Sequence, residues 1–244
     1  MRRFGLIGRT LGYSFSKGYF TDKFQKEGRT DCVYENYELD TVRAFPLLLE
    51  RHPDIAGLNV TIPYKKEILQ YLDTRDAAVA AIGACNTIRV RNGRLEGFNT
   101  DAIGFRDSLQ PLLRPGHRHA LVLGTGGAAA AIHYVLGQLG ISVTPVSRQR
   151  SPGNMSYADL DAETMERCRV IINTTPLGTW PDVGSCPPIP YQLLGEGHLL
   201  YDLVYNPEIT TFLRKGQERG AAIKNGYEML LLQAEASWRI WNGE

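Results

Sequence analysis

Short apolar runs alternate with amphipathic stretches through the first sixty residues. The runs near 3–8, 32–39 and 55–60 have the length and apolar content of buried strands. Helical spacing of apolar residues follows Ser16 and returns over 41–51. Strands that alternate with helices in this way predict an α/β fold.

A proline and a hairpin dipeptide mark the elements that follow. Pro63 suits the first turn of a helix, predicted to end near Leu72, and another helix is predicted at 74–83. Asn92-Gly93 then separates two extended segments, which is the strongest short-range signal for a β-hairpin. The segment 86–98 is therefore predicted to be a two-stranded ribbon.

The stretch between Arg118 and Arg148 contains no Lys, Arg, Asp or Glu. Its pattern is nevertheless that of a strand at 120–123, a glycine turn, an alanine-rich helix and a second strand at 142–146. Uncharged sequence broken in this way is typical of a buried parallel α/β unit, and it argues against a membrane span.

The remaining pattern predicts a doubly wound sheet and a last helix that returns to the first half of the chain. Pro115-Gly116 is a natural break before the sheet. We therefore expect two α/β domains with a cleft between them: a substrate domain of residues 1–101 plus 226–244, and a Rossmann-like domain of residues 102–225. The further elements are strands near 169–173, 198–203 and 221–224, and helices near 101–113, 208–218 and 226–241.

Composition narrows the kind of partner. Of the 244 residues, 43% are hydrophobic, which is enough for two modest cores. The 27 basic and 26 acidic residues nearly cancel and form no long block, which argues against nucleic acid or a membrane surface as the partner. We expect a small-molecule substrate, and a monomer or homodimer.

The cysteines and the N-terminus indicate a cytoplasmic chain. Cys32, Cys85, Cys168 and Cys186 are scattered without Cys-x-x-Cys spacing, as expected of reduced thiols rather than disulfides or a metal site. The first apolar run reaches Gly8 too soon for a secretory signal. The N-terminus thus favours a cytoplasmic protein, and the scattered cysteines lead us to predict no bound metal.

The glycine turn is the clearest candidate for binding chemistry. It joins a strand to a helix, so its backbone amides could hold a dinucleotide pyrophosphate at the helix N-terminus. The alternative is a tight strand-to-helix turn without a ligand. The turn consists of Gly124, Thr125, Gly126, Gly127 and Ala128.

The end of the next strand indicates which dinucleotide. Ser147-Arg148 stands where an NAD site usually carries an acid for the ribose 2′-hydroxyl. Arginine offers donors to a 2′-phosphate and no acceptor to a hydroxyl, so NADP is favoured over NAD. The loop Asn173-Thr174-Thr175 follows another strand and is expected to face the same cofactor.

Two charged residues could move a proton. Lys65 follows Pro63 in a predicted first helical turn, where the macrodipole disfavours a cation; the alternative is a solvated lysine, and the adjacent Lys66 shows that position alone does not choose. Asp101 begins another predicted helix, and could either complement that helix or accept a hydrogen bond from a substrate hydroxyl.

Several neutral polar residues are candidates for substrate contacts, and each also has a purely structural alternative. Hydroxyls at Ser14 and Ser16 could hold a carboxylate or cap a helix. Strand alternation turns Asn59 and Thr61 to one side, towards a polar rim. The other candidates are Asn86, Tyr205 and Gln233.

Together these segments resemble the shikimate dehydrogenase family of NADP-dependent α/β enzymes, over nearly the whole chain. Eight ordered segments are hard to obtain by chance. They are Ser14–Ser16, Asn59–Lys65, Gly83–Thr87, Gly97–Asp101, Gly124–Ala128, Asn173–Pro176, Asp202–Tyr205 and Gly226–Gln233.

The resemblance implies a role for each candidate. Lys65 and Asp101 would form the catalytic pair, and NADP would be the cofactor. Shikimate would be bound by Ser14, Ser16, Asn59, Thr61, Asn86, Asp101, Tyr205 and Gln233. NADP would be bound by Gly124, Thr125, Gly126, Gly127, Ala128, Ser147, Arg148, Thr174, Thr175, Leu203 and Gly226.

The first motif departs from the family pattern. Thr10 stands where the family favours Pro, Tyr13 where it favours His, and Lys17 where Pro is usual. These departures put the local loop shape and the polarity beside Ser14 in doubt, but they leave the proposed catalytic pair intact.

The resemblance implies reversible NADPH-dependent reduction of 3-dehydroshikimate to shikimate, a step of aromatic amino-acid (chorismate) biosynthesis. One alternative is a quinate/shikimate dehydrogenase with relaxed substrate choice or NAD use. A second alternative is a catalytically silent NADP-binding regulator, against which the presence of both Lys65 and Asp101 counts.

Overall fold

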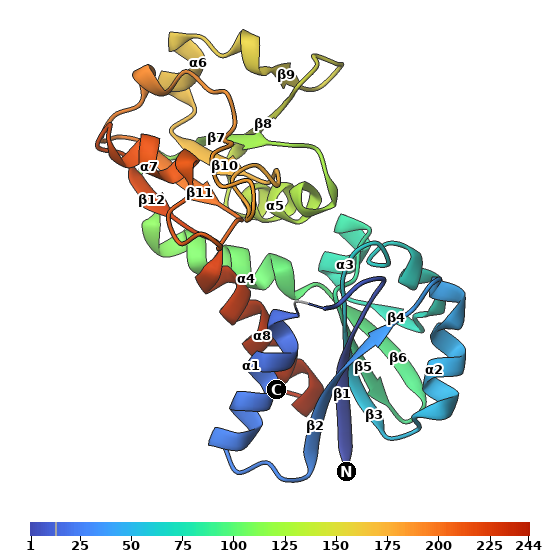
Figure 1. The fold of residues 1–244 in the computed structure, drawn as a ribbon. Helices are drawn as coiled ribbons and strands as arrows, with labels where there is room; N and C mark the ends of the chain where they lie inside the picture. Colours follow the sequence, from blue (N-terminus) through green and yellow to red (C-terminus); the bar gives the residue numbers. More distant parts are fainter. Residues whose placement is uncertain (13) are drawn as a thin grey trace. The chain divides into compact units, whose positions relative to one another are not determined.

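The computed structural model describes residues 1–12 and 14–244, and the chain divides into two compact units (Figure 1). Unit 1 comprises residues 1–100 and 234–244, and unit 2 comprises 101–233. Each unit has its own six-stranded sheet, so the predicted α/β class is confirmed. The sequence places the second domain boundary before the last helix, whereas the two units divide inside that helix.

The sheet of unit 1 is mixed. Strand β1 lies between β2 and β3 and is parallel to both, while β3, β5 and β6 are antiparallel neighbours and β4 is the edge strand beside β6. The strands are β1 (Arg2–Gly8), β2 (Cys32–Glu38), β3 (Ile55–Val60), β4 (Thr74–Arg75), β5 (Thr87–Arg91) and β6 (Arg94–Phe98).

The predicted ribbon over 86–98 is confirmed as the β5–β6 hairpin. Its turn residues Asn92 and Gly93 both have positive φ, 52° and 74°. A two-residue turn of this kind matches the right-handed twist of the strands and requires residues that tolerate the left-handed region, which explains the Asn-Gly dipeptide.

Helices cover both faces of this sheet (Figure 1). One face packs Phe4 against helix α1 and the end of helix α8, and the other packs Leu58 against helix α2 and the short helix η2. The helical elements of unit 1 are α1 (Phe15–Lys26), η1 (Val42–Ala44), α2 (Phe45–Arg51), η2 (Glu67–Tyr71) and α3 (Ala77–Ile82), with α8 (Tyr227–Asn242) reaching it from unit 2.

Two helix predictions in unit 1 need correction. The predicted helix from Pro63 to Leu72 is wrong: residues 62–66 form turns, and only the 3-10 helix η2 follows. The carbonyl of Lys65 accepts from the amide of Cys85 at 2.8 Å, so it is committed to another segment instead of to a helical turn. The predicted helix at 74–83 is shortened to α3 because its first residues form β4.

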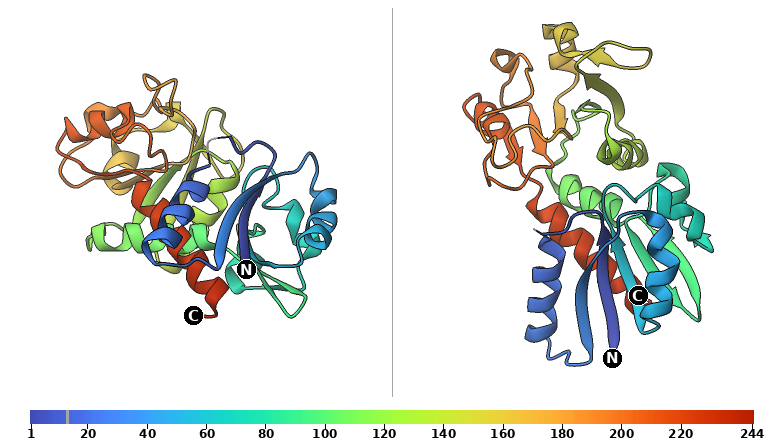
Figure 2. Two further views of the ribbon diagram at one scale, coloured as in Figure 1. Left: turned by 60° about the horizontal axis from the view of Figure 1, so that its bottom comes forward. Right: turned by 45° about the vertical axis from the view of Figure 1, so that its right-hand side comes forward.

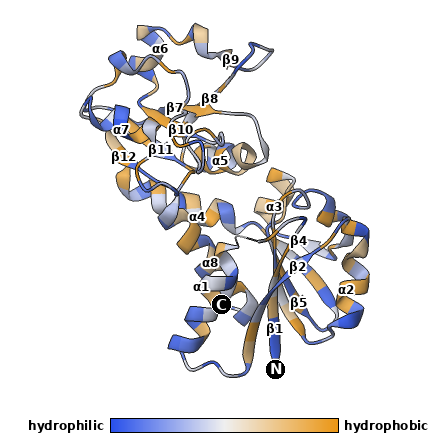
Figure 3. Ribbon diagram, in the orientation of Figure 1, coloured by the Kyte–Doolittle hydropathy of each residue, from blue (hydrophilic) through white to orange (hydrophobic). Residues whose placement is uncertain are grey.

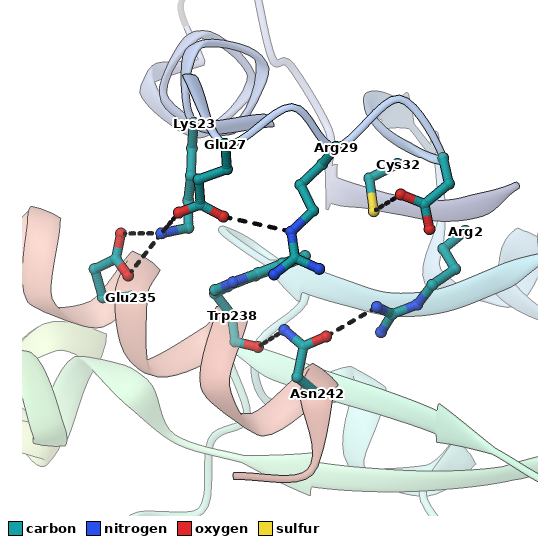
Figure 4. Close-up of polar contacts among 9 residues, drawn as sticks. Arg2, Lys23, Glu27, Arg29, Cys32, Glu235, Trp238 and Asn242 are labelled. Carbon is teal, nitrogen blue, oxygen red and sulfur yellow. Dashed lines mark hydrogen bonds and ion pairs between the residues drawn. The ribbon is translucent and has the colours of Figure 1, made fainter. Parts of the chain in front are cut away.

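Polar side chains fasten the end of α8 to unit 1 (Figure 4). Lys23 of α1 pairs with Glu235 of α8 at 2.9 Å, and Arg2 of β1 donates to the side chain of Asn242 at 2.8 Å. In the core beside them, the indole N–H of Trp241 donates to the carbonyl of Ile88 at 3.0 Å. The last turns of α8 are therefore part of the core and the polar surface of unit 1.

The sheet of unit 2 is parallel throughout, in the order β12-β11-β10-β7-β8-β9. Strand order reverses between β7 and β10, which is the point where open parallel sheets bind nucleotides. The strands are β7 (His119–Leu123), β8 (Ser142–Ser147), β9 (Met155–Ser156), β10 (Val170–Asn173), β11 (Leu199–Asp202) and β12 (Ala222–Lys224).

Helices flank this sheet as a doubly wound fold requires (Figure 2). The central strands β7 and β10 are fully buried along most of their length and are mainly apolar (Figure 3). The helical elements are α4 (Thr100–Leu109), η3 (Gln110–Leu112), α5 (Gly127–Gln138), η4 (Tyr157–Asp159), α6 (Ala162–Arg167), η5 (Tyr191–Leu193) and α7 (Thr211–Gln217). No helix formed by residues 1–12 and 14–244 is both long and apolar enough to cross a bilayer.

Candidate functional site

The backbone of Lys65 is hydrogen-bonded to Cys85, just before strand β5. Its side chain is half-buried, whereas that of Lys66 is exposed. The bond from the Cys85 amide to the Lys65 carbonyl is followed by one from the Val60 amide to the Asn86 carbonyl at 2.9 Å. The turn after β3 is thus pinned to the start of β5, and Lys65, unlike Lys66, is part of that junction.

The helix dipole does not act on Lys65 in the way the sequence predicts. That prediction required Lys65 to lie in the first turn of a helix that begins at Pro63, and no such helix forms. The position of Lys65 at the β3–β5 junction replaces it as the structural reason to consider this lysine.

Asn59 lies in a buried polar cluster and not on a rim. Its side-chain oxygen accepts from the Tyr34 hydroxyl at 2.9 Å, and its amide nitrogen lies 3.1 Å from the Thr87 hydroxyl and 2.9 Å from the Ser237 hydroxyl. These groups come from four elements, β2, β3, β5 and α8, and they leave Asn59 only 5% exposed. The predicted placement of Asn59 on a rim is therefore wrong. Contact of Asn59 with the substrate stays a prediction.

Asn86 links the start of β5 to the start of helix α4. Its side-chain oxygen accepts from the Thr100 amide at 2.7 Å, and its nitrogen donates to the Thr100 hydroxyl at 3.0 Å. The residue after Thr100 is Asp101, in the first turn of α4. The helix-complementing location predicted for Asp101 is confirmed, and Asn86 fixes the backbone immediately before it.

The two units divide between these residues. Lys65 and Asn86 belong to unit 1, while Asp101 is the first residue of unit 2. Within unit 1, hydrogen bonds join Lys65 to Cys85 and Asn86 to Thr100. The pairing of Lys65 with Asp101 remains a proposal.

Ser14 and Ser16 lie at the N-terminus of α1. Ser14 is the N-cap, and its hydroxyl accepts from the Lys17 amide at 3.3 Å, which confirms the helix-capping alternative for this residue. Both serines are half-buried, as is Thr61 at the end of β3. Tyr13 lies outside the described residues, while Lys17 lies in the first turn of α1.

The glycine turn has the geometry of a nucleotide-binding loop. Gly124 has φ +105°, and an added Cβ would come within 2.8 Å of the Thr174 hydroxyl, so glycine is required there. Helix α5 begins at Gly127. Its N-cap residue is Gly126, which has no side chain that could accept a hydrogen bond from the first amides of the helix. Residues 125–128 are exposed, so the first amides of α5 are accessible to an anionic group.

Thr174 and Thr175 lie directly against this turn. The Thr174 amide and hydroxyl both donate to the carbonyl of Leu123, at 2.9 and 2.8 Å. The Thr175 amide and hydroxyl both donate to the side-chain oxygen of Asn173, at 3.0 and 2.6 Å. The structure therefore brings together the glycine turn and the loop after β10.

Ser147 is the last residue of β8 and Arg148 follows it, but the Ser147 hydroxyl is already hydrogen-bonded. Its hydroxyl donates to the Gln149 carbonyl at 2.6 Å and accepts from the side chain of Asn154. Arg148 is exposed, whereas Arg150 lies 3.6 Å from Asp159 in an ion pair. Both arginines are exposed, and binding of a phosphate by Arg148 stays a prediction.

An open cavity of about 600 Å³ lies beside this strand, but it does not include the glycine turn. It is lined by residues 143–145 of β8 and by residues 150–155. Its walls contain Arg150 and Asn154 but not Arg148. We therefore do not equate the cavity with the predicted cofactor site.

Leu203 and Gly226 form a close backbone contact. A Cβ added to Gly226 would lie under 3.0 Å from the carbonyl oxygen of Leu203, which is shorter than the contacts that Cβ atoms make, so only glycine fits. Tyr205 is exposed and lies three residues after the last residue of β11. Gln233 is buried on α8, where its side chain donates to the Leu230 carbonyl at 2.9 Å.

Sequence reasoning assigned no role to two buried residues near these sites. Ser237 completes the cluster around Asn59, and Asp202 receives hydrogen bonds at the end of β11. Ser237 has no local signal because its partners are distant along the chain. Asp202 does have a local signal, because it ends an apolar strand, and burial of a carboxylate there costs free energy unless the group is hydrogen-bonded.

Fold and site define a two-unit α/β protein in which a parallel sheet carries a dinucleotide-type turn. Comparison with known proteins narrows this class. A family model described as "Shikimate dehydrogenase substrate binding domain" matches residues 6–88. A relative from Caldicellulosiruptor saccharolyticus, named shikimate dehydrogenase (NADP(+)), is 32% identical over 99% of this chain and 92% of its own length.

Solved structures agree over the full length. Shikimate 5-dehydrogenase from Thermus thermophilus, in complex with NADP(H) and shikimate, is 31% identical with a TM-score of 0.86, covering 100% of this chain and 94% of its own. Quinate dehydrogenase from Corynebacterium glutamicum, in complex with NAD, has a TM-score of 0.88 at 24% identity, over 100% and 94% of the two chains, and shows the fold alone. The chain belongs to the shikimate dehydrogenase family.

Proposed function

We propose that this protein catalyses the reversible NADPH-dependent reduction of 3-dehydroshikimate to shikimate. The observation that carries the proposal is the full-length similarity to NADP(+)-type shikimate dehydrogenases, including a solved relative that holds both NADP(H) and shikimate. A role in aromatic amino-acid (chorismate) biosynthesis follows from that reaction and belongs to the same proposal.

The residues of unit 2 fit a dinucleotide. The backbone at Gly124 is pressed against Thr174, and the amides that begin α5 are exposed, so an anionic pyrophosphate could approach the helix N-terminus closely. Arg148 would bind the 2′-phosphate, and Leu203 and Gly226 would contact the same cofactor. When bound, this cofactor supplies or accepts the hydride.

The proton is handled by Lys65 in this proposal. In reduction, the Lys65 ammonium donates a proton to the oxygen that becomes the substrate hydroxyl; in oxidation, the neutral amine takes it back. Asp101 accepts a hydrogen bond from that hydroxyl and orients it. Ser14 and Ser16 would hold the substrate carboxylate, with Thr61, Asn86, Tyr205 and Gln233 as further contacts.

An absorbance assay tests the function directly. Purified protein is given shikimate or quinate, each with NADP⁺ or NAD⁺, and the reduced nicotinamide is followed. We expect shikimate with NADP⁺ to give the highest kcat/KM. A preference for quinate or NAD⁺ would favour the relaxed-specificity alternative, and tight ligand binding without any absorbance change would favour a silent regulator.

A further inference from the structure

The carboxylate of Asp202 is completely buried. The proposed reaction assigns it no role. Asp202 ends β11, one residue before Leu203. Its Oδ1 accepts from the side-chain nitrogen of Asn173 at 2.9 Å and from the Val204 amide at 3.0 Å. Its Oδ2 accepts from the Thr210 hydroxyl at 2.6 Å.

Each of the three donors orders a different segment. Asn173 also accepts from Thr175, so it holds the loop that lies against Gly124. Val204 lies between Leu203 and Tyr205, so the bond from its amide fixes the backbone at the start of the loop after β11. Thr210 caps α7 by accepting from the Leu213 amide at 3.3 Å, so it fixes the far end of the loop 203–210.

Only an ionised carboxylate satisfies this arrangement fully. Asn173 and Val204 present N–H donors that can only donate, and Thr210 donates its single proton to Oδ2. Burial raises the pKa of Asp202 to about 6, and the bonds from Thr210, Val204 and Asn173 oppose that rise. The charge of Asp202 also acts on Tyr191 of η5, whose pKa is raised chiefly by burial, next by Cys186 and then by Asp202.

We propose that Asp202 is a positioning residue for the cofactor: it couples the loop after β10 to the loop after β11, so that Thr174, Thr175 and Leu203 keep the arrangement that binds NADP. The inference rests on the proposed function, because it assumes that these two loops contact NADP. It adds to that function a group that touches neither cofactor nor substrate.

The first test is Asp202→Asn, with NADPH affinity measured by nicotinamide fluorescence in the absence of substrate. The variant keeps the shape but places an N–H₂ where Oδ2 accepted the Thr210 proton. We expect the NADPH Kd to rise roughly tenfold at pH 8, as for the loss of one hydrogen bond to a charged group, with kcat at saturation within about twofold.

The matched control is Asp161→Asn. Asp161 lies in the same unit and accepts from the Thr164 amide at 2.8 Å to cap α6, so the chemical change is the same but neither cofactor loop is involved. We expect its NADPH Kd to equal that of the wild type. An equal loss of affinity in both variants would assign the effect to general destabilisation and overturn the proposal.

A second pair of variants covers the case in which Asp202→Asn fails to fold. Thr210→Val removes the donor to Oδ2, and Thr210→Ser retains it. We expect Val to weaken NADPH binding by about fivefold or more and Ser to restore it. Equal affinity for both variants would contradict the coupling through Thr210.

The pH profile separates positioning from mere structure. Protonated Asp202 resembles Asn, so the difference in NADPH Kd between wild type and Asp202→Asn should be largest above pH 7 and should shrink as the pH falls below about 6. A difference that stays constant from about pH 5 to 8 would refute the proposal. If wild-type protein binds no NADPH at any pH, the proposed function itself fails.

Discussion

Two adjacent lysines show how much a single position depends on its tertiary contacts. The sequence offers Lys65 and Lys66 with equal claim, and the helix expected to contain them does not form. The structure separates them, because the backbone of Lys65 is bonded to Cys85 and its side chain is half-buried, whereas the side chain of Lys66 is exposed.

The difference between these lysines gives the first prediction. Lys65→Ala should lower kcat for shikimate oxidation by roughly 10²–10⁴-fold, because the proton acceptor is lost, while shikimate affinity stays within a few-fold. Lys66→Ala is the matched control and should leave kcat within about twofold. Steady-state kinetics at saturating NADP⁺ would measure both, and an unchanged kcat in Lys65→Ala would exclude the proposed role.

His117 should make folding stability depend on pH. It is buried, its Nδ1 accepts from the Arg114 amide at 3.1 Å, and its Nε2 bonds the Gly197 carbonyl at 3.2 Å. Burial lowers the pKa of His117, and the positive charge of Arg114 adds to that effect. Because the folded state binds the proton less well than the unfolded chain, stability is lost as the pH falls through about 6.5.

Urea unfolding of the wild type and of His117→Gln between about pH 5 and 8 would check this. The wild type should lose more stability than the variant on acidification, because only the wild type carries the buried imidazole. Parallel losses in the two proteins would show that other groups cause the pH dependence.

At the scale of elements, the sequence predicts well what local chemistry determines. The Asn92-Gly93 turn and the strand-turn-helix around Gly124 were predictable because each needs particular residues at particular backbone angles. The helix after Pro63 and the rim position of Asn59 were not. Both were decided by groups far along the chain, Cys85 for the first and Ser237 for the second.

The contact between Gly226 and Leu203 gives an element-scale prediction. Gly226→Ala should cost about 1–3 kcal/mol of stability, because the added methyl forces the start of α8 away from the end of β11. The shift should also weaken NADPH binding if Leu203 contacts the cofactor. Thermal unfolding and cofactor titration would measure the two effects.

Gly137→Ala is the control for that substitution. Gly137 is an exposed residue of α5, and apart from its own stretch of helix no atom of the described residues lies within 4 Å of an added Cβ. Alanine there should raise stability by up to about 1 kcal/mol through its helix propensity. Destabilisation of equal size by both substitutions would argue against a specific clash at Gly226.

For the whole molecule, the sequence predicted two α/β units and the family to which they belong. It did so because the pattern of strands and the eight motifs are properties of consecutive residues. The choice of which residues hold others in place was not accessible, since Asp202, Asn173 and Thr210 meet only after the sheet has formed. The proposed roles of the individual site residues remain predictions.

Cofactor selectivity can be measured through the stability of the whole protein. At a hundredfold excess over its Kd, NADP⁺ should add about 2.7 kcal/mol to the free energy of unfolding and raise Tm by several degrees. NAD⁺ at the same concentration should raise Tm less, because it offers no 2′-phosphate to Arg148. In Arg148→Ala, the two cofactors should give similar shifts in Tm; a retained preference for NADP⁺ would exclude Arg148 as the selective group.

The return of α8 to the first sheet has a consequence for biosynthesis. Phe4 and Phe20 pack with Trp238 and Trp241, which are translated only after the whole of residues 101–233. During synthesis, one face of the N-terminal sheet is therefore covered by α1 alone until residues 101–233 have been added. A nascent chain stalled before Ala234 would present the remaining apolar surface of that face to chaperones, and synthesis of residues 234–242 would allow it to be covered.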